Sequence, residues 1–213
     1  YRRKACFKNK KIKNVDKGNS EMPLHSEASY SPSWPKIVWF YCNIAPKKSG
    51  FTTICDGMEV YKNLKTKTKN FFLKNQIIYS LKVPFGNIKN KYPKKLKSWI
   101  MDEPGVFDCK IDLRNKEIFF KYKKYALIKN QHKNKLAFVN HLQMNIKKDP
   151  QVLLIKLEGH KIIPKDIQID YKKSCLKFTK KIYWKKGDLV MIDNHRYLHG
   201  RTKILKNEKR DIV

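Results

Sequence analysis

Short apolar stretches separated by polar turns recur along the whole chain. Seven of them are rich in β-branched or aromatic residues, which fit the pleated surface of a strand. They predict strands over residues 37–44, 51–56, 117–122, 135–140, 151–157, 188–193 and 209–213. Because these stretches are spread over the full length, the pattern favours a mainly β architecture.

Helical patterns are fewer. Pro164 can occupy the first position of a helix, and apolar or aromatic residues follow it at helical spacing. These residues are Ile167, Tyr171, Cys175 and Phe178. A second short helix is predicted over residues 56–64. Many strands with few helices predict an α+β chain of mainly β type, a double-stranded β-helix that is also called a jelly roll and is typical of cupin-like proteins.

The chain is predicted to form a single domain over residues 1–213. At 213 residues, 41% of them hydrophobic, it can bury a sizeable core and is too apolar for a disordered chain. No internal repeat or Gly/Ser linker divides it, and no run of eighteen apolar residues predicts a transmembrane helix. The Lys-rich range 61–98 is predicted to be an insertion or a lid over the barrel mouth.

The net charge of +31 would suit a nucleic-acid-binding module. However, nearly all the cations are lysines spread along the chain, whereas phosphate and base recognition favours the fork of arginine. Arginine occurs only at positions 2, 3, 114, 196, 201 and 210. We therefore interpret the charge as compositional and predict no specific nucleic-acid partner and no membrane association.

Five cysteines, an odd number without Cys-x-x-Cys spacing, argue against a disulfide framework and a zinc knuckle. The first residues lack the apolar region of a secretion signal. Both observations predict a reducing, cytoplasmic location.

Two imidazoles and one carboxylate are placed where they can share a metal. His25 and Glu27 form a His-x-Glu pair near the start, and His199 lies near the end. This is the ligand set of the 2-His-1-carboxylate site of non-haem Fe(II) oxygenases. Arg210, eleven positions past His199, offers a fork for a carboxylate. The combination suggests a 2-oxoglutarate-dependent oxygenase, although a His-x-Glu pair alone is more often an ordinary surface pair.

The remaining histidines are not expected to bind the metal. His132, His160 and His195 have polar, turn-like or loop surroundings that predict solvated side chains. His141 is predicted to be a packed core histidine, with a place in the lining of the pocket as the alternative.

The segments around the candidate ligands resemble one known family. They are residues 24–30, 50–56, 137–141, 153–164, 184–201 and 209–210. The stretch that runs from Trp184 through Gly187-Asp188 and Asp193-Asn194 to His199-Gly200-Arg201 is the most specific of them. Together they resemble the TauD/TfdA-like (taurine dioxygenase and clavaminate-synthase-like) oxygenases, from about Leu24 to the end of the chain.

This resemblance implies roles for five residues. His25, Glu27 and His199 would bind Fe(II), with Glu27 replacing the more usual Asp, and Arg210 with Thr52 would hold the far carboxylate of 2-oxoglutarate. Thr53 is the alternative to Thr52. The same resemblance implies use of O2 and release of succinate and CO2.

The substrate is less clear than the cofactors. The family likeness favours hydroxylation of a small amino-acid-like molecule, free or tethered to an acidic carrier protein, and it assigns no substrate-binding residue. A catabolic oxygenase of a small sulfonate or carboxylate is the alternative within enzymes. A non-catalytic cupin-like binding protein and a basic nucleic-acid-binding module are the alternatives from other classes.

Overall fold

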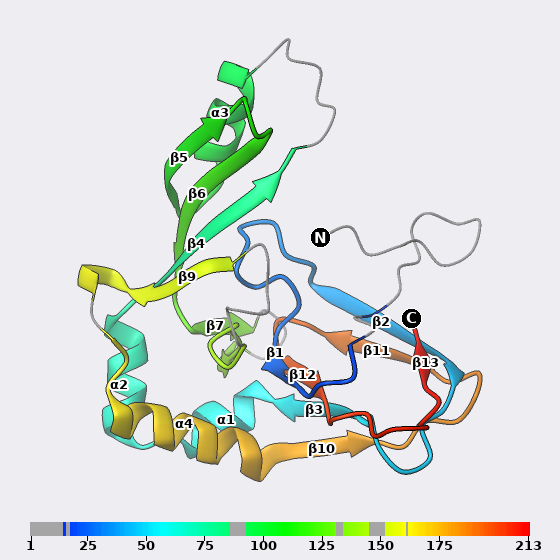
Figure 1. Cartoon of the computed structure of the whole chain (residues 1–213). Coiled ribbons are helices and arrows are strands. Elements are labelled where there is room, and N and C mark those ends of the chain that lie inside the picture. Colours follow the sequence, from blue (N-terminus) through cyan, green and yellow to red (C-terminus); the bar gives the residue numbers. More distant parts are fainter. Residues whose placement is uncertain (1–14, 16–17, 86–92, 131–133, 145–151, 161) are drawn as a thin grey trace.

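A computed structural model describes residues 15, 18–85, 93–130, 134–144, 152–160 and 162–213 (Figure 1). The strands of the N-terminal half are β1 (Met22–His25), β2 (Ile37–Ile44), β3 (Thr52–Asp56), β4 (Ile77–Pro84), β5 (Val106–Asp112) and β6 (Glu117–Lys124). Those that follow are β7 (Leu127–Asn130), β8 (Lys135–Phe138), β9 (Val152–Leu157), β10 (Thr179–Ile182), β11 (Leu189–Asp193), β12 (Tyr197–Arg201) and β13 (Asp211–Ile212). The α-helices are α1 (Gly57–Asn63), α2 (Thr66–Lys74), α3 (Pro93–Met101) and α4 (Lys165–Phe178).

Two antiparallel sheets built from both ends of the chain form the barrel. One has the strand order β1-β12-β3-β10 and the other β11-β2-β13. A small apolar cluster joins them: Phe40 and Ile192 from the second sheet pack with partly buried residues of the first, among them Ile54 and Ile182. Two antiparallel sheets that share one core are the arrangement expected of a jelly roll.

The helices cover the outside of the first sheet. Figure 1 shows α1, α2 and α4 on the side of β3 and β10 that faces away from β2. On the buried faces of these helices, Val60, Phe72 and Tyr171 are at most 2% exposed and pack in one cluster with Cys55 of β3. Asp56 starts α1 by accepting a hydrogen bond from the Met58 backbone N–H, the ordinary role of an N-cap aspartate.

A third sheet, of order β5-β6-β4-β9, extends away from the barrel and carries α3 along β5 (Figure 1). In β4 every second residue faces the core, and Ile77, Tyr79 and Leu81 are at most 1% exposed. The intervening residues are only partly buried. This sheet therefore has one apolar face and one face turned toward solvent.

All seven predicted strands are present, with ends that differ by up to two residues. Differences of two residues occur at the ends of β6 and β8 and at the start of β13; residue 151 of the 151–157 prediction lies outside the described residues. Both predicted helices form, with Pro164 at the N-cap of α4 and not at its first position. The fold class predicted from the sequence is confirmed.

The Lys-rich range 61–98, predicted to be an insertion or a lid, contains regular secondary structure. It includes α2 and β4, whose Phe72 and Tyr79 are fully buried, so these elements belong to the core. Residues 86–92 of the range lie outside the described residues. A role of the range as a lid stays a prediction. Within the described parts of the chain, no helix has both the length and the apolar content needed to span a membrane.

Candidate active site

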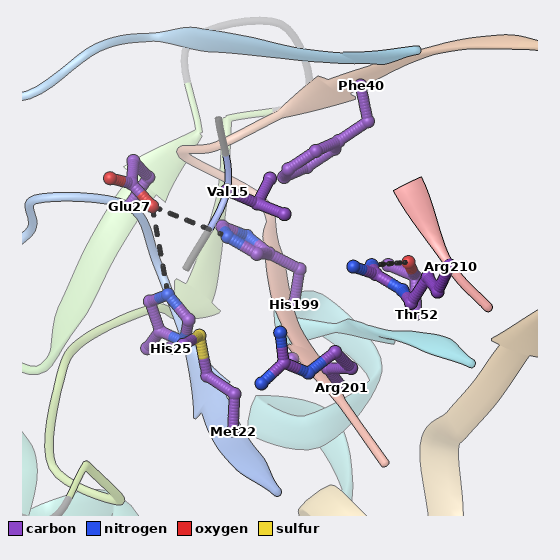
Figure 2. Close-up of a pocket in the computed structure, with 10 residues that line it drawn as sticks. Val15, Met22, His25, Glu27, Phe40, Thr52, His199, Arg201 and Arg210 are labelled. Atoms are coloured by element: carbon purple, nitrogen blue, oxygen red, sulfur yellow. Dashed lines mark hydrogen bonds and ion pairs between the residues drawn. The ribbon is translucent and has the colours of Figure 1, made fainter. Parts of the chain in front are cut away.

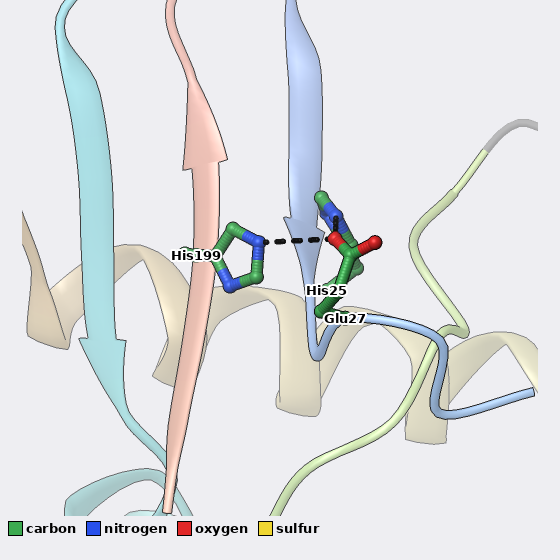
Figure 3. A group of neighbouring side chains, drawn as sticks. All are labelled: His25, Glu27 and His199. Carbon is green, nitrogen blue, oxygen red and sulfur yellow. Dashed lines mark ion pairs between the residues drawn. The ribbon is translucent and has the colours of Figure 1, made fainter. Parts of the chain in front are cut away.

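The three candidate ligands meet at the end of β1 (Figure 3). His25 is the last residue of β1 and lies opposite His199 in the antiparallel pairing of β1 with β12. Glu27 follows two residues later, beyond the end of the strand. Both histidines are buried, at 4% and 5% exposure, and Glu27 is half-buried. Strand pairing thus brings residues from opposite ends of the sequence to one point.

The donor atoms are spaced for a shared ion. Glu27 Oε2 lies 3.7 Å from His25 Nε2 and 3.6 Å from His199 Nε2. These distances are too long for hydrogen bonds. Two ligands of one ion lie at most twice the bond length apart, about 4.2 Å for bonds of about 2.1 Å, so each carboxylate–imidazole pair can be bridged by one ion. Within the described residues, this is the one group of three or more His, Cys, Asp or Glu side chains that could hold a metal.

The imidazole of His25 is oriented for ligation. Its Nδ1 lies 2.9 Å from the carbonyl oxygen of Pro23. Because a carbonyl can only accept, Nδ1 carries a proton, and in the neutral ring Nε2, which faces Glu27, is left with a lone pair for a metal. Hydrogen bonding of the second ring nitrogen to a backbone carbonyl is typical of metal-binding histidines.

Gly200 allows the ligand strands to approach one another. A Cβ atom on Gly200 would lie 2.5 Å from the carbonyl oxygen of Met22 and 3.0 Å from Thr53 Oγ1. Any larger residue directly after His199 would push β1 or β3 away. The glycine therefore preserves the spacing between His25 and His199.

A pocket continues from the three ligands to a buried cationic end (Figure 2). Its walls include Phe40, Thr52, Arg201 and Arg210. Arg210 Nη2 donates to Thr52 Oγ1 at 3.2 Å, and the indole Nε1 of Trp184 donates to the same oxygen at 2.9 Å. With two donors occupying its acceptor positions, the Thr52 hydroxyl keeps its own proton for an anionic oxygen in the pocket.

Two guanidinium groups give this end of the pocket its charge. Burial, followed by the nearby charge of Arg201, lowers the pKa of Arg210 to about 10, so Arg210 remains cationic at neutral pH. Arg201 is 6% exposed, and its Nη2 donates to the carbonyls of Ser20, at 2.9 Å, and of Gly18. The site is therefore suited to a carboxylate that enters beside Arg210.

The structure brings all five predicted site residues together and distinguishes Thr52 from Thr53. Thr52 lines the pocket and contacts Arg210, whereas Thr53 is not among the lining residues. The sequence assigns no role to Trp184, which belongs to the segment 184–201 that resembles the family. No local signal marks it as a partner of Thr52, 132 residues earlier in the chain.

The other histidines have mixed outcomes. His141 is 3% exposed and packs edge-on against His25, with ring centroids 5.3 Å apart, in agreement with a buried histidine near the site. His195 is not part of the metal group, as predicted, but the prediction that its side chain is solvated was wrong: its ring stacks on Trp34 at 4.2 Å, and burial lowers its pKa. His132 lies outside the described residues, and only the backbone of His160, in a short 3-10 helix, is described.

Comparison with known proteins places this site in a family. Residues 6–213 match the family described as taurine catabolism dioxygenase TauD, TfdA family. The chain belongs to the TauD/TfdA family. The family assignment made from the sequence is thereby confirmed, because the match covers nearly the whole chain.

Related proteins agree with the TauD/TfdA assignment. A 3-((Z)-2-isocyanoethenyl)-1H-indole synthase of Fischerella ambigua is 21% identical over 203 residues, which cover 91% of this chain and 62% of that protein. A putative alpha-ketoglutarate-dependent taurine dioxygenase from Burkholderia xenovorans has the same fold, with a TM-score of 0.60 and 11% identity over 97% of this chain and 64% of that one.

Two further solved structures share the fold, and their descriptions mention bound cofactors or a pathway of their own. AAD-2, solved with Mn(II) and N-oxalylglycine, has a TM-score of 0.57 and 16% identity over 90% of this chain and 66% of its own. PvcB, described as an Fe, alpha-ketoglutarate-dependent oxygenase from an isonitrile synthetic pathway, has a TM-score of 0.53 and 14% identity over 92% of this chain and 56% of its own. The chain thus spans less than two thirds of the length of the relatives named here.

Proposed function

We propose that this chain is an Fe(II)/2-oxoglutarate-dependent dioxygenase that hydroxylates a small amino-acid-like molecule. The observation that carries the proposal is the convergence of His25, Glu27 and His199 beside a pocket that ends in Arg210 and Thr52. The ligand set suits Fe(II), and the cationic end suits the far carboxylate of 2-oxoglutarate. The TauD/TfdA family match and the Mn(II) and N-oxalylglycine bound to AAD-2 support it.

Each residue has a defined task in this reaction. His25 and His199 offer neutral imidazoles, and Glu27 offers the negative charge that partly balances a divalent ion. Arg210 and the Thr52 hydroxyl orient the cosubstrate. When bound, Fe(II) supplies the oxygen chemistry, in which one atom of O2 enters the succinate formed with CO2 from 2-oxoglutarate and the other enters a substrate C–H bond. Because Glu27 occupies a ligand position that a halide would need, hydroxylation is favoured over halogenation.

The substrate class rests on the relatives. The Fischerella ambigua enzyme is named for an isocyanoethenyl indole, and PvcB is described as part of an isonitrile synthetic pathway. Both descriptions concern small nitrogen-containing organic molecules, which supports an amino-acid-like substrate more than a sulfonate. The net charge of +31 would also attract an acidic carrier protein that presents a tethered substrate.

The test is reconstitution of the purified chain with Fe(II) and 2-oxoglutarate without oxygen. We expect a weak visible charge-transfer band that appears only with both components, and succinate after O2 is admitted. The matched variant Glu27→Ala should show neither. A band without succinate, even after candidate amino acids are added, would support a non-catalytic binding protein. Absence of the band in a chain that folds would contradict the proposal.

A further inference from the structure

The ligand Glu27 lies outside the sheet that positions the other two ligands. His25 and His199 are fixed by the pairing of β1 with β12, and this pairing ends at His25. Directly after Glu27, Ala28 adopts a left-handed backbone conformation with φ of 53°, which is uncommon for a residue other than glycine. Strand pairing therefore does not explain how the backbone of Glu27 is held.

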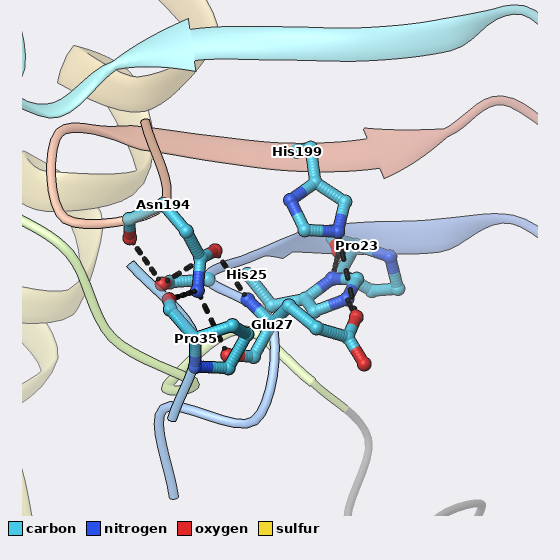
Figure 4. A network of polar contacts seen from close by, with 7 residues as sticks. Pro23, His25, Glu27, Pro35, Asn194 and His199 are labelled. Atoms are coloured by element: carbon cyan, nitrogen blue, oxygen red, sulfur yellow. Dashed lines mark hydrogen bonds and ion pairs between the residues drawn. The ribbon is translucent and has the colours of Figure 1, made fainter. Parts of the chain in front are cut away.

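The side chain of Asn194 bonds to both polar backbone atoms of Glu27 (Figure 4). The Glu27 N–H donates to Asn194 Oδ1 at 2.8 Å, and Asn194 Nδ2 donates to the Glu27 carbonyl oxygen at 3.0 Å. A neighbouring strand would make the same pair of contacts with its backbone amide and carbonyl. The carboxamide thus takes the place of a strand at the residue where β1 has ended.

Asn194 is itself fixed on every side. It is fully buried, and its second Nδ2 proton is donated to the Pro35 carbonyl at 2.8 Å. Its backbone N–H donates to the Lys36 carbonyl at 2.8 Å, and its carbonyl accepts from Ser26 Oγ at 2.7 Å. A group held by so many short contacts in a buried site has little freedom, so it can transmit its position to Glu27.

Asparagine suits this position better than its closest substitutes. Its carboxamide has two donated protons and one carbonyl oxygen, and all are used. Aspartate would turn an oxygen toward two carbonyl oxygens, and alanine would leave the Glu27 N–H and carbonyl buried without these partners. The place of Asn194 in the chain also matters, because it follows β11 directly and lies five residues before His199.

We propose that Asn194 is a positioning residue that holds the carboxylate ligand Glu27 in register with His25 and His199. The proposal rests on the metal site of the proposed function. Asn194 does not contact the ion position; it acts through the backbone of Glu27. Partners of this kind, bonded to a metal ligand and not to the metal, commonly change metal affinity about 10- to 100-fold when they are removed.

A purely structural role would lower stability without changing metal affinity, and Asn130 provides the matched control. This buried asparagine donates to the carboxylate of Asp193 at 3.1 Å, next to Asn194, whereas the two side-chain contacts to the Glu27 backbone described above come from Asn194. Asn130→Ala therefore removes a buried carboxamide at the end of β7, which contacts the residue next to Asn194, and leaves the two contacts of Asn194 with Glu27 in place.

The experiment measures Mn(II) binding by electron paramagnetic resonance together with thermal unfolding of the metal-free chain. Both Asn194→Ala and Asn130→Ala should lower the unfolding temperature, but only Asn194→Ala should weaken Mn(II) affinity, by about tenfold or more. If Asn194→Ala does not fold, Asn194→Asp, which keeps the side-chain volume, gives the same comparison.

Three outcomes are distinguishable. Wild-type Mn(II) affinity in a folded Asn194 variant would overturn the positioning role, as would an equal loss in Asn130→Ala. Failure of the wild-type chain to bind Mn(II) at all would instead contradict the proposed function.

Discussion

The barrel and the sheet formed by β5, β6, β4 and β9 use their buried space differently. In the barrel, buried polar side chains converge on one pocket: His25, Thr52, His199 and Arg201 are each at most 6% exposed. In the other sheet the most buried strand positions are mainly apolar. Apart from the buried amine of Lys124 at the end of β6, its charges include exposed pairs such as Lys121 with Asp108, 2.7 Å apart.

This difference indicates which region carries chemistry and which carries stability. Burying polar groups costs free energy unless each finds a partner. The barrel buries several polar groups, including two guanidiniums side by side, and is therefore less stabilised by apolar packing there; these groups are available to bind a ligand instead. Substitutions in the barrel should therefore change ligand binding first, whereas substitutions in the projecting sheet should change only the free energy of unfolding.

The largest expected effect tests the convergence itself. His25→Ala, Glu27→Ala and His199→Ala should each abolish detectable Mn(II) binding and succinate formation, because each removes one of three donor atoms. His195→Ala is the control, since its ring stacks on Trp34 and is not part of the group. An essential His195 together with a dispensable His199 would contradict the assignment.

The next effect concerns the cationic end of the pocket. Arg210→Ala should raise the KM for 2-oxoglutarate about 10- to 100-fold while Mn(II) still binds, since a hydrogen bond to a charged group contributes about 1.5–3 kcal/mol. Arg210→Lys should recover part of this loss, because an ammonium lacks the fork. Steady-state kinetics give both values. If wild type, Arg210→Ala and Arg210→Lys had equal KM values, the far carboxylate of 2-oxoglutarate would have to be held by Arg201 instead.

A smaller effect on the KM for 2-oxoglutarate is expected for Trp184, which contacts Thr52 rather than the proposed carboxylate position. Trp184→Phe removes the donor to Thr52 Oγ1 and should raise the KM for 2-oxoglutarate about threefold to tenfold, as expected for loss of one hydrogen bond of about 1 kcal/mol. In a Thr52→Val background the same substitution should add little, because the shared oxygen is already gone. Additive effects in the double variant would show that Trp184 acts independently of Thr52.

The buried amine at the junction of the two regions gives a pH-dependent prediction. Burial lowers the pKa of Lys124 to about 7, and its Nζ lies 3.6 Å from the centre of the Trp34 ring. Between about pH 7 and about pH 10 the unfolded chain therefore binds a proton that the folded chain lacks, and stability rises with pH. Burying the charged amine of Lys124 lowers the free energy of unfolding, and this cost is largest at and below pH 7. Contact of the cation with the Trp34 ring offsets part of it.

Lys124→Met should therefore stabilise the fold, and the gain over wild type should be at least about 1 kcal/mol larger at pH 7 than at pH 9. Urea unfolding at both pH values measures it. Lys123→Met is the control, because Lys123 is partly exposed and pairs with Glu158 at the surface. A gain that does not change with pH would mean that Lys124 is solvated.

The smallest effect belongs to the surface of the projecting sheet. Lys121→Ala breaks an ion pair whose side chains are about half exposed and should change the free energy of unfolding by less than about 0.5 kcal/mol. Ile77→Ala, in the buried face of the same sheet, should cost about 2–5 kcal/mol. A Lys121 effect that approaches that of Ile77 would contradict the view that the charge of this sheet is mostly solvated.

The sequence predicted the elements whose local pattern agrees with their environment. β2, with its apolar and aromatic run, was predicted with the bounds that it has. β4 was missed because its apolar alternation lies within a Lys-rich range, and β12 was missed because His199, Gly200 and Arg201 do not resemble a strand. Residues 197–201 form β12 because they pair with β1 on one side and with β3 on the other. The local sequence pattern does not show this pairing.

The site was predictable to the extent that residue type alone specifies its chemistry. His25, Glu27, His199 and Arg210 could be proposed from their donor groups and the family resemblance. The contacts of Trp184, Asn194 and His195 could not, because each partner lies more than 100 residues away in the chain. The error for His195 follows directly, since polar neighbours in sequence say nothing about stacking on Trp34.

The pairing of β1 with β12 has a consequence for how the protein is made. β1 lies at the edge of its sheet, and its partner begins only near the end of the chain, with His199 174 residues after His25 (199 minus 25). During synthesis β1 can therefore pair with β12 only after the residues between them have been made. Contacts of such long sequence separation form slowly. Acquisition of the metal would then follow this slow pairing, so a metal-loaded chain is one in which β1 and β12 have already paired.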